Sequence, residues 1–256
     1  MLLPGLKIFD SHFHIIDKQF PLTPSKGYLP ESFTCDDYLD RMKIYNLAGG
    51  AVASGSFQAF DQSYLLTALK KLGPRFVGVT QLPATVSDDD ILKLDKAGVR
   101  AIRFNVKGGG SETVDKLEIF AGRVYEMAGW HVELYIDSSD LPDLYGILAN
   151  LPSVSIDHLG LSRAGFKTVL ELVEKGVRVK ASGFGRVDFD VKEAIKSICT
   201  ANPDALMFGT DLPSTRAPRP YSDEDFLLVY ETLGETIAQK VFYDNAVAFY
   251  RPLSTT

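Results

Sequence analysis

The chain has 256 residues, of which 45% are hydrophobic, and a formal net charge of −6 at pH 7. This favours one large domain over residues 1–256 rather than two small ones. The acidic balance, with no basic cluster, argues against nucleic acid and anionic membranes as partners. No apolar run reaches the roughly 20 residues of a membrane-spanning helix, and no signal segment is recognised. We therefore expect a cytoplasmic protein, in which Cys35 and Cys199 match no metal-binding spacing and are reduced thiols.

Eight short runs rich in strand-forming residues alternate with amphipathic segments. The amphipathic segments carry helix signals, such as acids near Ser87 and Ser111 at their starts and Gly73, Gly129 and Gly176 at their ends. This alternation predicts an α/β fold, a single (β/α)8 TIM barrel. A doubly wound open sheet is the alternative, but no nucleotide-binding fingerprint follows the first run. The predicted strands are 7–15, 50–57, 76–82, 99–106, 131–137, 154–160, 177–184 and 206–212.

The first predicted strand carries two histidines, His12 and His14, spaced two residues apart. Alternate residues of a strand point to the same face, so both imidazoles project together. Two buried imidazoles side by side are costly unless they bind a metal, an anion or a polarised carbonyl. The pair therefore indicates a functional site at the end of this strand.

The remaining predicted strands also end in polar residues, which a barrel brings to one mouth. His131 is excluded because it begins its strand and belongs to the opposite rim, where residues serve stability. Gly108–Gly110 lacks the spacing of a phosphate-binding loop, so we expect a flexible loop. The polar strand-end residues are Ser54, Ser56, Gln58, Gln81, Arg103, Asn105, Tyr135, Asp137, His158, Ser182, Arg186 and Asp211.

Three cations near these strand ends need anionic partners or solvent. Arg103 alternates onto the inward face, where it pairs with either a substrate carboxylate or a protein carboxylate. Arg186, beyond the seventh strand, is either a ligand or a solvated surface residue. Lys180 is expected to be structural, paired with a buried acid such as Asp10 or Glu133.

These motifs resemble those of the amidohydrolase superfamily. The matching elements are the His-x-His of the first strand, Asp157-His158-Leu159-Gly160 of the sixth and Gly209-Thr210-Asp211 of the eighth. More narrowly, the chain resembles the metal-independent lactonases typified by 2-pyrone-4,6-dicarboxylate lactonase. Runs such as Gly98–Asn105 and Gly129–Tyr135 extend the similarity over essentially the whole chain.

The resemblance implies a hydrolase that opens a carboxylate-bearing lactone by water attack, without a cofactor. Asp211 would be the general base, and His12, His14 and His158 would bind and polarise the lactone carbonyl. Ser56, Arg103, Tyr135 and Arg186 would bind the rest of the substrate, which resembles 2-pyrone-4,6-dicarboxylate or a sugar lactone.

Two alternatives stay open. Metal-dependent relatives have a histidine at the end of the fifth strand, where this chain has Tyr135, which favours a metal-free site. The first alternative is a zinc-dependent amidohydrolase or decarboxylase with His12, His14 and Asp211 as Zn²⁺ ligands. The second is a barrel without catalytic activity that binds an anionic metabolite.

The chain departs from the dicarboxylate lactonase at two arginine positions, where it has Gly108–Gly110 and Leu161. A clamp for two carboxylates is therefore only partly present, and the substrate is expected to be a monocarboxylate or a less charged lactone. Arg216 or Arg219 either restores a positive contact or lies on the surface. The sequence leaves open the lactone itself, the pathway and whether copies of the chain form a homo-oligomer.

Overall fold

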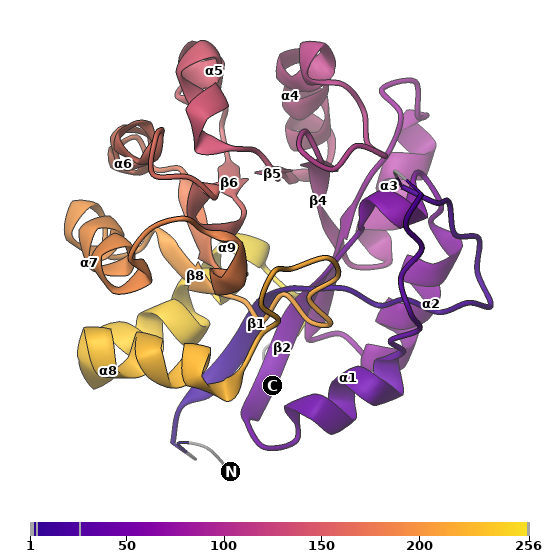
Figure 1. The fold of residues 1–256 in the computed structure, drawn as a ribbon. Helices are drawn as coiled ribbons and strands as arrows, with labels where there is room; N and C mark the ends of the chain where they lie inside the picture. The colour runs from indigo at the N-terminus through magenta and orange to yellow at the C-terminus, as the bar shows by residue number, and fades with distance from the viewer. Residues whose placement is uncertain (1–2, 4, 26, 255–256) are drawn as a thin grey trace.

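Eight parallel strands follow one another in chain order around a barrel, with helices on its outside (Figure 1). The computed structural model describes residues 3, 5–25 and 27–254. The expectation of no signal segment rests partly on residues 1, 2 and 4, which lie outside the described residues. The strands are β1 (Lys7–Phe13), β2 (Asn46–Ala53), β3 (Phe76–Thr80), β4 (Val99–Phe104), β5 (His131–Leu134), β6 (Val154–Ile156), β7 (Arg178–Ala181) and β8 (Leu206–Phe208).

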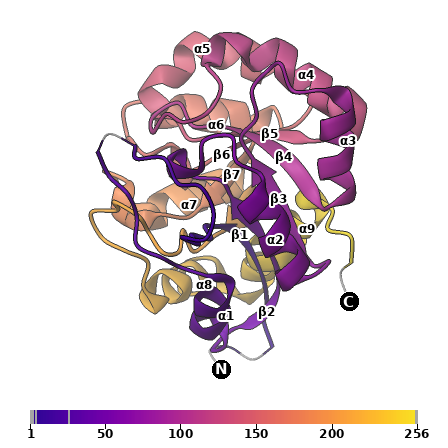
Figure 2. The ribbon, with the colours of Figure 1, turned by 90° about the vertical axis from the view of Figure 1, so that its right-hand side faces the viewer.

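Helices connect successive strands and cover the outer face of the sheet (Figure 2). Within the described ranges, no helix is both long enough and apolar enough to cross a membrane. The α-helices are α1 (Cys35–Met42), α2 (Ser63–Leu72), α3 (Asp88–Lys96), α4 (Leu117–Ala128), α5 (Leu141–Leu148), α6 (Phe166–Glu174), α7 (Val191–Ala201), α8 (Asp223–Gln239) and α9 (Asn245–Tyr250).

The helix signals in the sequence have identifiable structural roles. The Ser87 hydroxyl accepts a hydrogen bond from the backbone N–H of Asp90 and so caps α3. Gly129 ends α4 in the left-handed conformation, with φ of 67°. The start predicted near Ser111 is too early, because a turn of 3-10 helix at Val114–Lys116 precedes α4.

All eight predicted strands are present, and each ends earlier than predicted. The predicted ends instead form short 3-10 turns, including Ser56–Gln58, His158–Gly160 and Phe184–Arg186. His158 itself has a φ of 51°, which breaks the extended strand. Most of the polar residues therefore lie on bent segments over the barrel mouth, whereas His12 and Arg103 lie within β1 and β4.

The barrel closes where β1 meets the end of β8. The Ser11 hydroxyl donates to the carbonyl oxygen of Phe208 at 2.6 Å. The backbone N–H of Asp211 donates to the carbonyl of His12 at 2.7 Å, and that of His14 donates to Leu212 at 2.7 Å. The two polar motifs from opposite ends of the sequence are thus fixed against each other.

An apolar layer and a buried ionic layer lie beneath the mouth. Phe9, Val79 and Met207 pack with Tyr250, which belongs to the C-terminal helix α9. Glu133 and Lys180 are fully buried in the same barrel. Since buried charges require partners, this ionic layer bears directly on the geometry of the site above it.

Candidate active site

Three histidines converge on Asp211, which follows β8. The Nε2 atoms of His12, His14 and His158 lie 3.8, 3.9 and 3.8 Å from Asp211 Oδ1. The rings of His14 and His158 each contact the His12 ring edge-on, at centroid distances of 5.0 and 4.8 Å. The four residues predicted to be catalytic therefore form one cluster.

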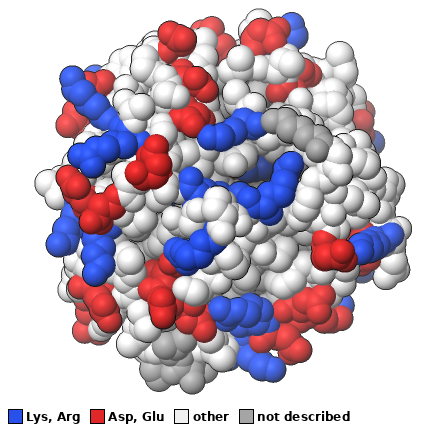
Figure 3. All heavy atoms as spheres, viewed as in Figure 1, with Lys and Arg blue, Asp and Glu red and all other residues white. Residues whose placement is uncertain are grey.

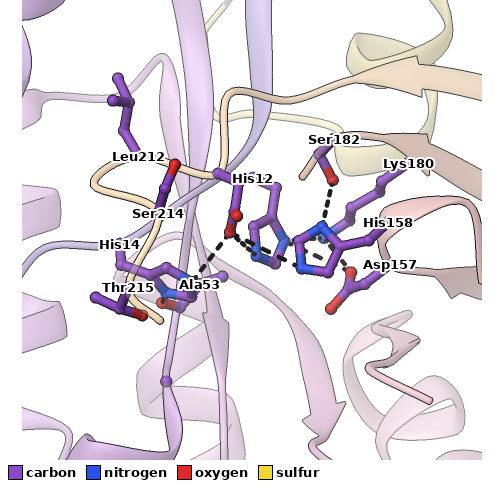
Figure 4. A network of polar contacts seen from close by, with 12 residues as sticks. His12, His14, Ala53, Asp157, His158, Lys180, Ser182, Leu212, Ser214 and Thr215 are labelled. Carbon is purple, nitrogen blue, oxygen red and sulfur yellow. Dashed lines mark hydrogen bonds and ion pairs between the residues drawn. The ribbon is translucent and has the colours of Figure 1, made fainter. Parts of the chain in front are cut away.

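The other ring nitrogen of each histidine has a partner of its own (Figure 4). His14 Nδ1 lies 2.7 Å from the Ala53 carbonyl oxygen, which can only accept, so this nitrogen carries the proton. His12 Nδ1 lies 3.1 Å from the Lys180 ammonium, which can only donate. His14 thus presents a lone pair at Nε2. The Lys180 contact favours an N–H at His12 Nε2, while Asp157 Oδ1 also lies 3.5 Å from His12 Nδ1.

Burial keeps these rings neutral. Loss of water contact lowers the pKa of His12 and lowers those of His14 and His158 well below the usual 6.5. The nearby Arg103 guanidinium lowers all three further. At neutral pH the cluster therefore consists of neutral imidazoles.

The Asp211 carboxylate has two different oxygens. Oδ2 accepts a hydrogen bond from Arg186 Nε at 2.7 Å. Oδ1 is buried and has no hydrogen-bond partner in the described part of the chain, and the same is true of His12 Nε2. Asp211 also has a left-handed φ of 60°, an uncommon conformation for a residue other than glycine. Two unpartnered polar atoms 3.8 Å apart mark the point where a ligand would complete the site.

Arg103 sits in a buried ion network below the cluster. Its Nη2 and Nε donate to Asp157 Oδ2 at 2.8 and 3.1 Å, and its Nη1 donates to the Ser54 carbonyl at 2.9 Å. Burial alone would raise the pKa of Asp157, but Lys180, His12 and Arg103 hold it well below its usual value. Of the two roles left open for Arg103, the structure shows the protein ion pair.

Lys180 pairs with Glu133, which confirms one of the two predicted partners, and its Nζ also lies 3.2 Å from Asp157 Oδ1. The other predicted partner, Asp10, is wrong: its carboxylate accepts from the backbone and hydroxyl of Thr210 and from Tyr38. Asp10 therefore takes part in barrel closure, through its contacts with Thr210 after β8.

A pocket of about 240 Å³ opens above Asp211, and basic side chains surround a hollow on this face (Figure 3). All four residues predicted to bind substrate line it. Phe57, Lys107 and Thr215 were not among the predicted residues, although Lys107 follows the fourth strand closely enough to be a candidate. The lining residues are His14, Gly55, Ser56, Phe57, Arg103, Asn105, Lys107, Gly108, Tyr135, His158, Arg186, Asp211, Thr215 and Arg216.

Several predicted mouth residues have structural roles instead. Asp137 caps the turn after β5 and pairs with Lys107 at 2.7 Å. The Gln81 amide donates to carbonyls of the surrounding loops, including Gly110 at 3.1 Å. His131 is buried beside Glu133 at 3.1 Å and does not line the pocket, as expected. Of the two loop arginines, Arg216 lines the pocket, whereas Arg219 pairs with Asp225 at 2.7 Å.

The donor set matches a divalent metal in type. His12, His158 and Asp211 offer ligand atoms that all lie within 4.8 Å of one another. This grouping differs from the predicted one by containing His158 in place of His14. Imidazole and carboxylate ligands suit zinc. However, when Lys180 donates to His12 Nδ1, the proton of that ring is on Nε2, and a protonated nitrogen cannot bind a metal.

Comparisons with known proteins agree with the fold. The chain is 27% identical to a 2-pyrone-4,6-dicarboxylate hydrolase of Comamonas testosteroni, covering 95% of this chain and 90% of that protein. It is 24% identical to a D-galactarolactone isomerase of Agrobacterium fabrum, covering 94% and 90%.

Solved structures are similar over nearly their whole length. One, described as a 2-pyrone-4,6-dicarboxylic acid hydrolase from Pseudomonas putida, is 26% identical with a TM-score of 0.81, covering 96% of this chain and 98% of that one. Another, from Acinetobacter baumannii, shares the fold with a TM-score of 0.85 at 20% identity, covering 95% and 99%. The amidohydrolase family itself matches residues 9–251. The chain therefore belongs to the amidohydrolase family of enzymes.

Proposed function

We propose that this enzyme opens a carboxylate-bearing lactone by attack of water, without a metal. The observation that carries the proposal is the unpartnered Asp211 Oδ1, which faces three neutral imidazoles at 3.8 to 3.9 Å. The names of two relatives, one a dicarboxylate hydrolase and the other a lactone isomerase, support a lactone substrate.

The fixed protons divide the work of the histidines. A water between Asp211 Oδ1 and His14 Nε2 donates one hydrogen to each, because both atoms are acceptors. The His12 N–H donates to the lactone carbonyl oxygen and stabilises the negative charge that develops there. His158 lies beside the same carbonyl, oriented by Ser182 at 2.9 Å.

The reaction then needs one proton transfer in each direction. Asp211 takes a proton as the water oxygen bonds to the carbonyl carbon. When the ring C–O bond breaks, Asp211 returns this proton to the leaving oxygen, which gives an open-chain hydroxy acid. One carboxylate thus acts as base and then as acid.

Asp211→Asn tests this assignment. Because the amide cannot accept the proton, kcat for lactone opening should fall by about 10² to 10⁴, the usual contribution of a general base. Thermal unfolding checks that the variant is folded, and Asp36→Asn, whose carboxylate pairs with Lys71 on the surface outside the pocket, is the matched control. Full turnover by folded Asp211→Asn protein would show that Asp211 is not the general base.

The grouping of His12, His158 and Asp211 supports a zinc-dependent hydrolase or decarboxylase as the second candidate. A bound divalent ion would polarise a carbonyl and acidify water at this position. Elemental analysis of chelator-treated enzyme, paired with a lactone screen, separates the two. Turnover with less than about a tenth of an equivalent of metal supports the metal-free enzyme; turnover lost on chelation and restored by zinc supports the alternative.

A further inference from the structure

Four cations line the pocket, and three of them already contact protein carboxylates. In each of these three ion pairs the protein carboxylate offsets the positive charge, so little of that charge remains to attract an anionic substrate. The pairs are Arg103 with Asp157 at 2.8 Å, Arg186 with Asp211 at 2.7 Å, and Lys107 with Asp137 at 2.7 Å.

Arg216 is different because its contacts are all neutral. Its Nη2 donates to the Ser56 hydroxyl at 3.1 Å and its Nη1 to the Ser25 carbonyl at 3.4 Å. The guanidinium also lies over the Tyr28 ring, 5.1 Å from its centroid. Within the described residues it has no ion pair. Since a guanidinium has five N–H groups, Arg216 keeps donors for an incoming anion.

The loop after β8 holds Arg216 over the pocket. Ser214 and Arg216 have left-handed φ values of 64° and 57°, which L-residues adopt only when their surroundings impose them. The Ser214 hydroxyl accepts from the backbone N–H of Tyr221 at 3.0 Å and so fixes the turn. The same loop begins with Asp211, so the proposed base and the uncompensated cation share one segment.

We propose that Arg216 binds the substrate's carboxylate and that the substrates are monoanionic lactones, an inference that rests on the proposed lactone hydrolysis. A single uncompensated charge matches a single carboxylate, and the planar guanidinium binds it through paired hydrogen bonds. The carboxylate would then lie on the side of the ring that faces Ser56 and Tyr28.

A matched substrate pair tests this assignment. The probes are 2-pyrone-5-carboxylate and its methyl ester, with ring opening followed by the loss of pyrone absorbance. Arg216→Gln should lower kcat/KM for the acid by roughly 10- to 150-fold, the range for a hydrogen bond to a charged group, and leave that for the ester unchanged. Arg219→Gln, whose arginine pairs with Asp225 outside the pocket, should change neither. Equal losses on both substrates, or none, would overturn the assignment.

A dianionic probe and an unreactive one complete the design. The wild-type enzyme should prefer 2-pyrone-5-carboxylate to 2-pyrone-4,6-dicarboxylate; the reverse preference would overturn the monoanionic class. Calorimetric titration with furan-2-carboxylate measures carboxylate binding without turnover. If no lactone is opened but Arg216→Gln still weakens furan-2-carboxylate binding, the proposed hydrolysis fails and the carboxylate site stands. If lactones are opened but Arg216→Gln leaves furan-2-carboxylate binding unchanged, the carboxylate site at Arg216 is overturned and the proposed hydrolysis stands.

Discussion

At the scale of single residues, the protonation of the site histidines depends on hydrogen bonds made by their Nδ1 atoms, which point away from Asp211. The Ala53 carbonyl and the Lys180 ammonium assign opposite protonation patterns to His14 and His12. One strand thereby supplies an acceptor and a donor two residues apart, both set before substrate arrives. Such preorganised dipoles need no rearrangement during the reaction.

Removal of Arg103 is expected to affect stability first. Because it leaves Asp157 buried beside fewer cations, Arg103→Gln should lower the free energy of unfolding by about 3–5 kcal/mol, the typical cost of breaking a buried ion pair. Urea denaturation measures this loss. Arg103→Gln combined with Asp157→Asn should recover part of it. A stable single variant with KM raised by the equivalent of roughly 1.5–3 kcal/mol would instead show that Arg103 serves mainly the substrate.

The sequence predicts those features of the site that depend on local patterns or on strand order, and not those that depend on loop conformation. The convergence of His12, His14, His158 and Asp211 follows from strand alternation and barrel order, which are local or topological patterns. The pairing of Arg186 with Asp211 depends on the conformations of two loops. Loop backbones with left-handed residues such as Arg216 have no periodic signal in the sequence. The sequence therefore predicted which residues meet, but not the partner of each charge.

At the scale of elements, short turns after the strands shape the pocket. The loop after β4 is pressed against the turn after β2, so that a Cβ on Gly110 would lie 2.4 Å from the Ser56 carbonyl oxygen. Gly109 has nearly the same φ, 76° against 77°, yet a Cβ there meets nothing within 4 Å. A substitution at Gly109 therefore introduces backbone strain alone, whereas one at Gly110 introduces the same strain and a clash with Ser56.

Gly110→Ala should therefore perturb the pocket, whereas Gly109→Ala should not. Both alanines are strained at positive φ, so each should cost stability, about 1 kcal/mol. Only Gly110→Ala also displaces Ser56, which contacts Arg216, and kcat/KM should fall in this variant alone. Steady-state kinetics and thermal unfolding of the two variants measure both effects. Equal kinetics in both variants would show that the loop contact has no role in substrate binding.

At the scale of the whole molecule, buried ionisable groups couple stability to pH. Burial lowers the pKa of all four histidines, His12, His14, His131 and His158. Below the ordinary value of 6.5 the unfolded chain therefore binds more protons than the folded one, which favours unfolding. Burial raises the pKa of Asp10 from 3.8 to about 6, so this single group has the opposite effect between those values.

The free energy of unfolding should accordingly decrease as the pH falls from 7.5 to 5.5. Each histidine contributes a slope of up to about 1.4 kcal/mol per pH unit below 6.5. Urea denaturation across this range should show a shallower slope for His14→Gln than for the wild type. Parallel slopes would mean that His14 is protonated equally in both states.

The seam between β1 and β8 also dictates when the enzyme becomes competent during folding. Ser11 and Phe208, which join across it, are 197 residues apart in the chain. Contacts between such distant residues carry a large loop-closure entropy and form after local ones. A chain that has folded everything except this seam holds His12 and His14 on one side of the opening and Asp211 on the other. If these residues catalyse the proposed reaction, we expect activity to require the closed ring and partly folded chains to be inactive.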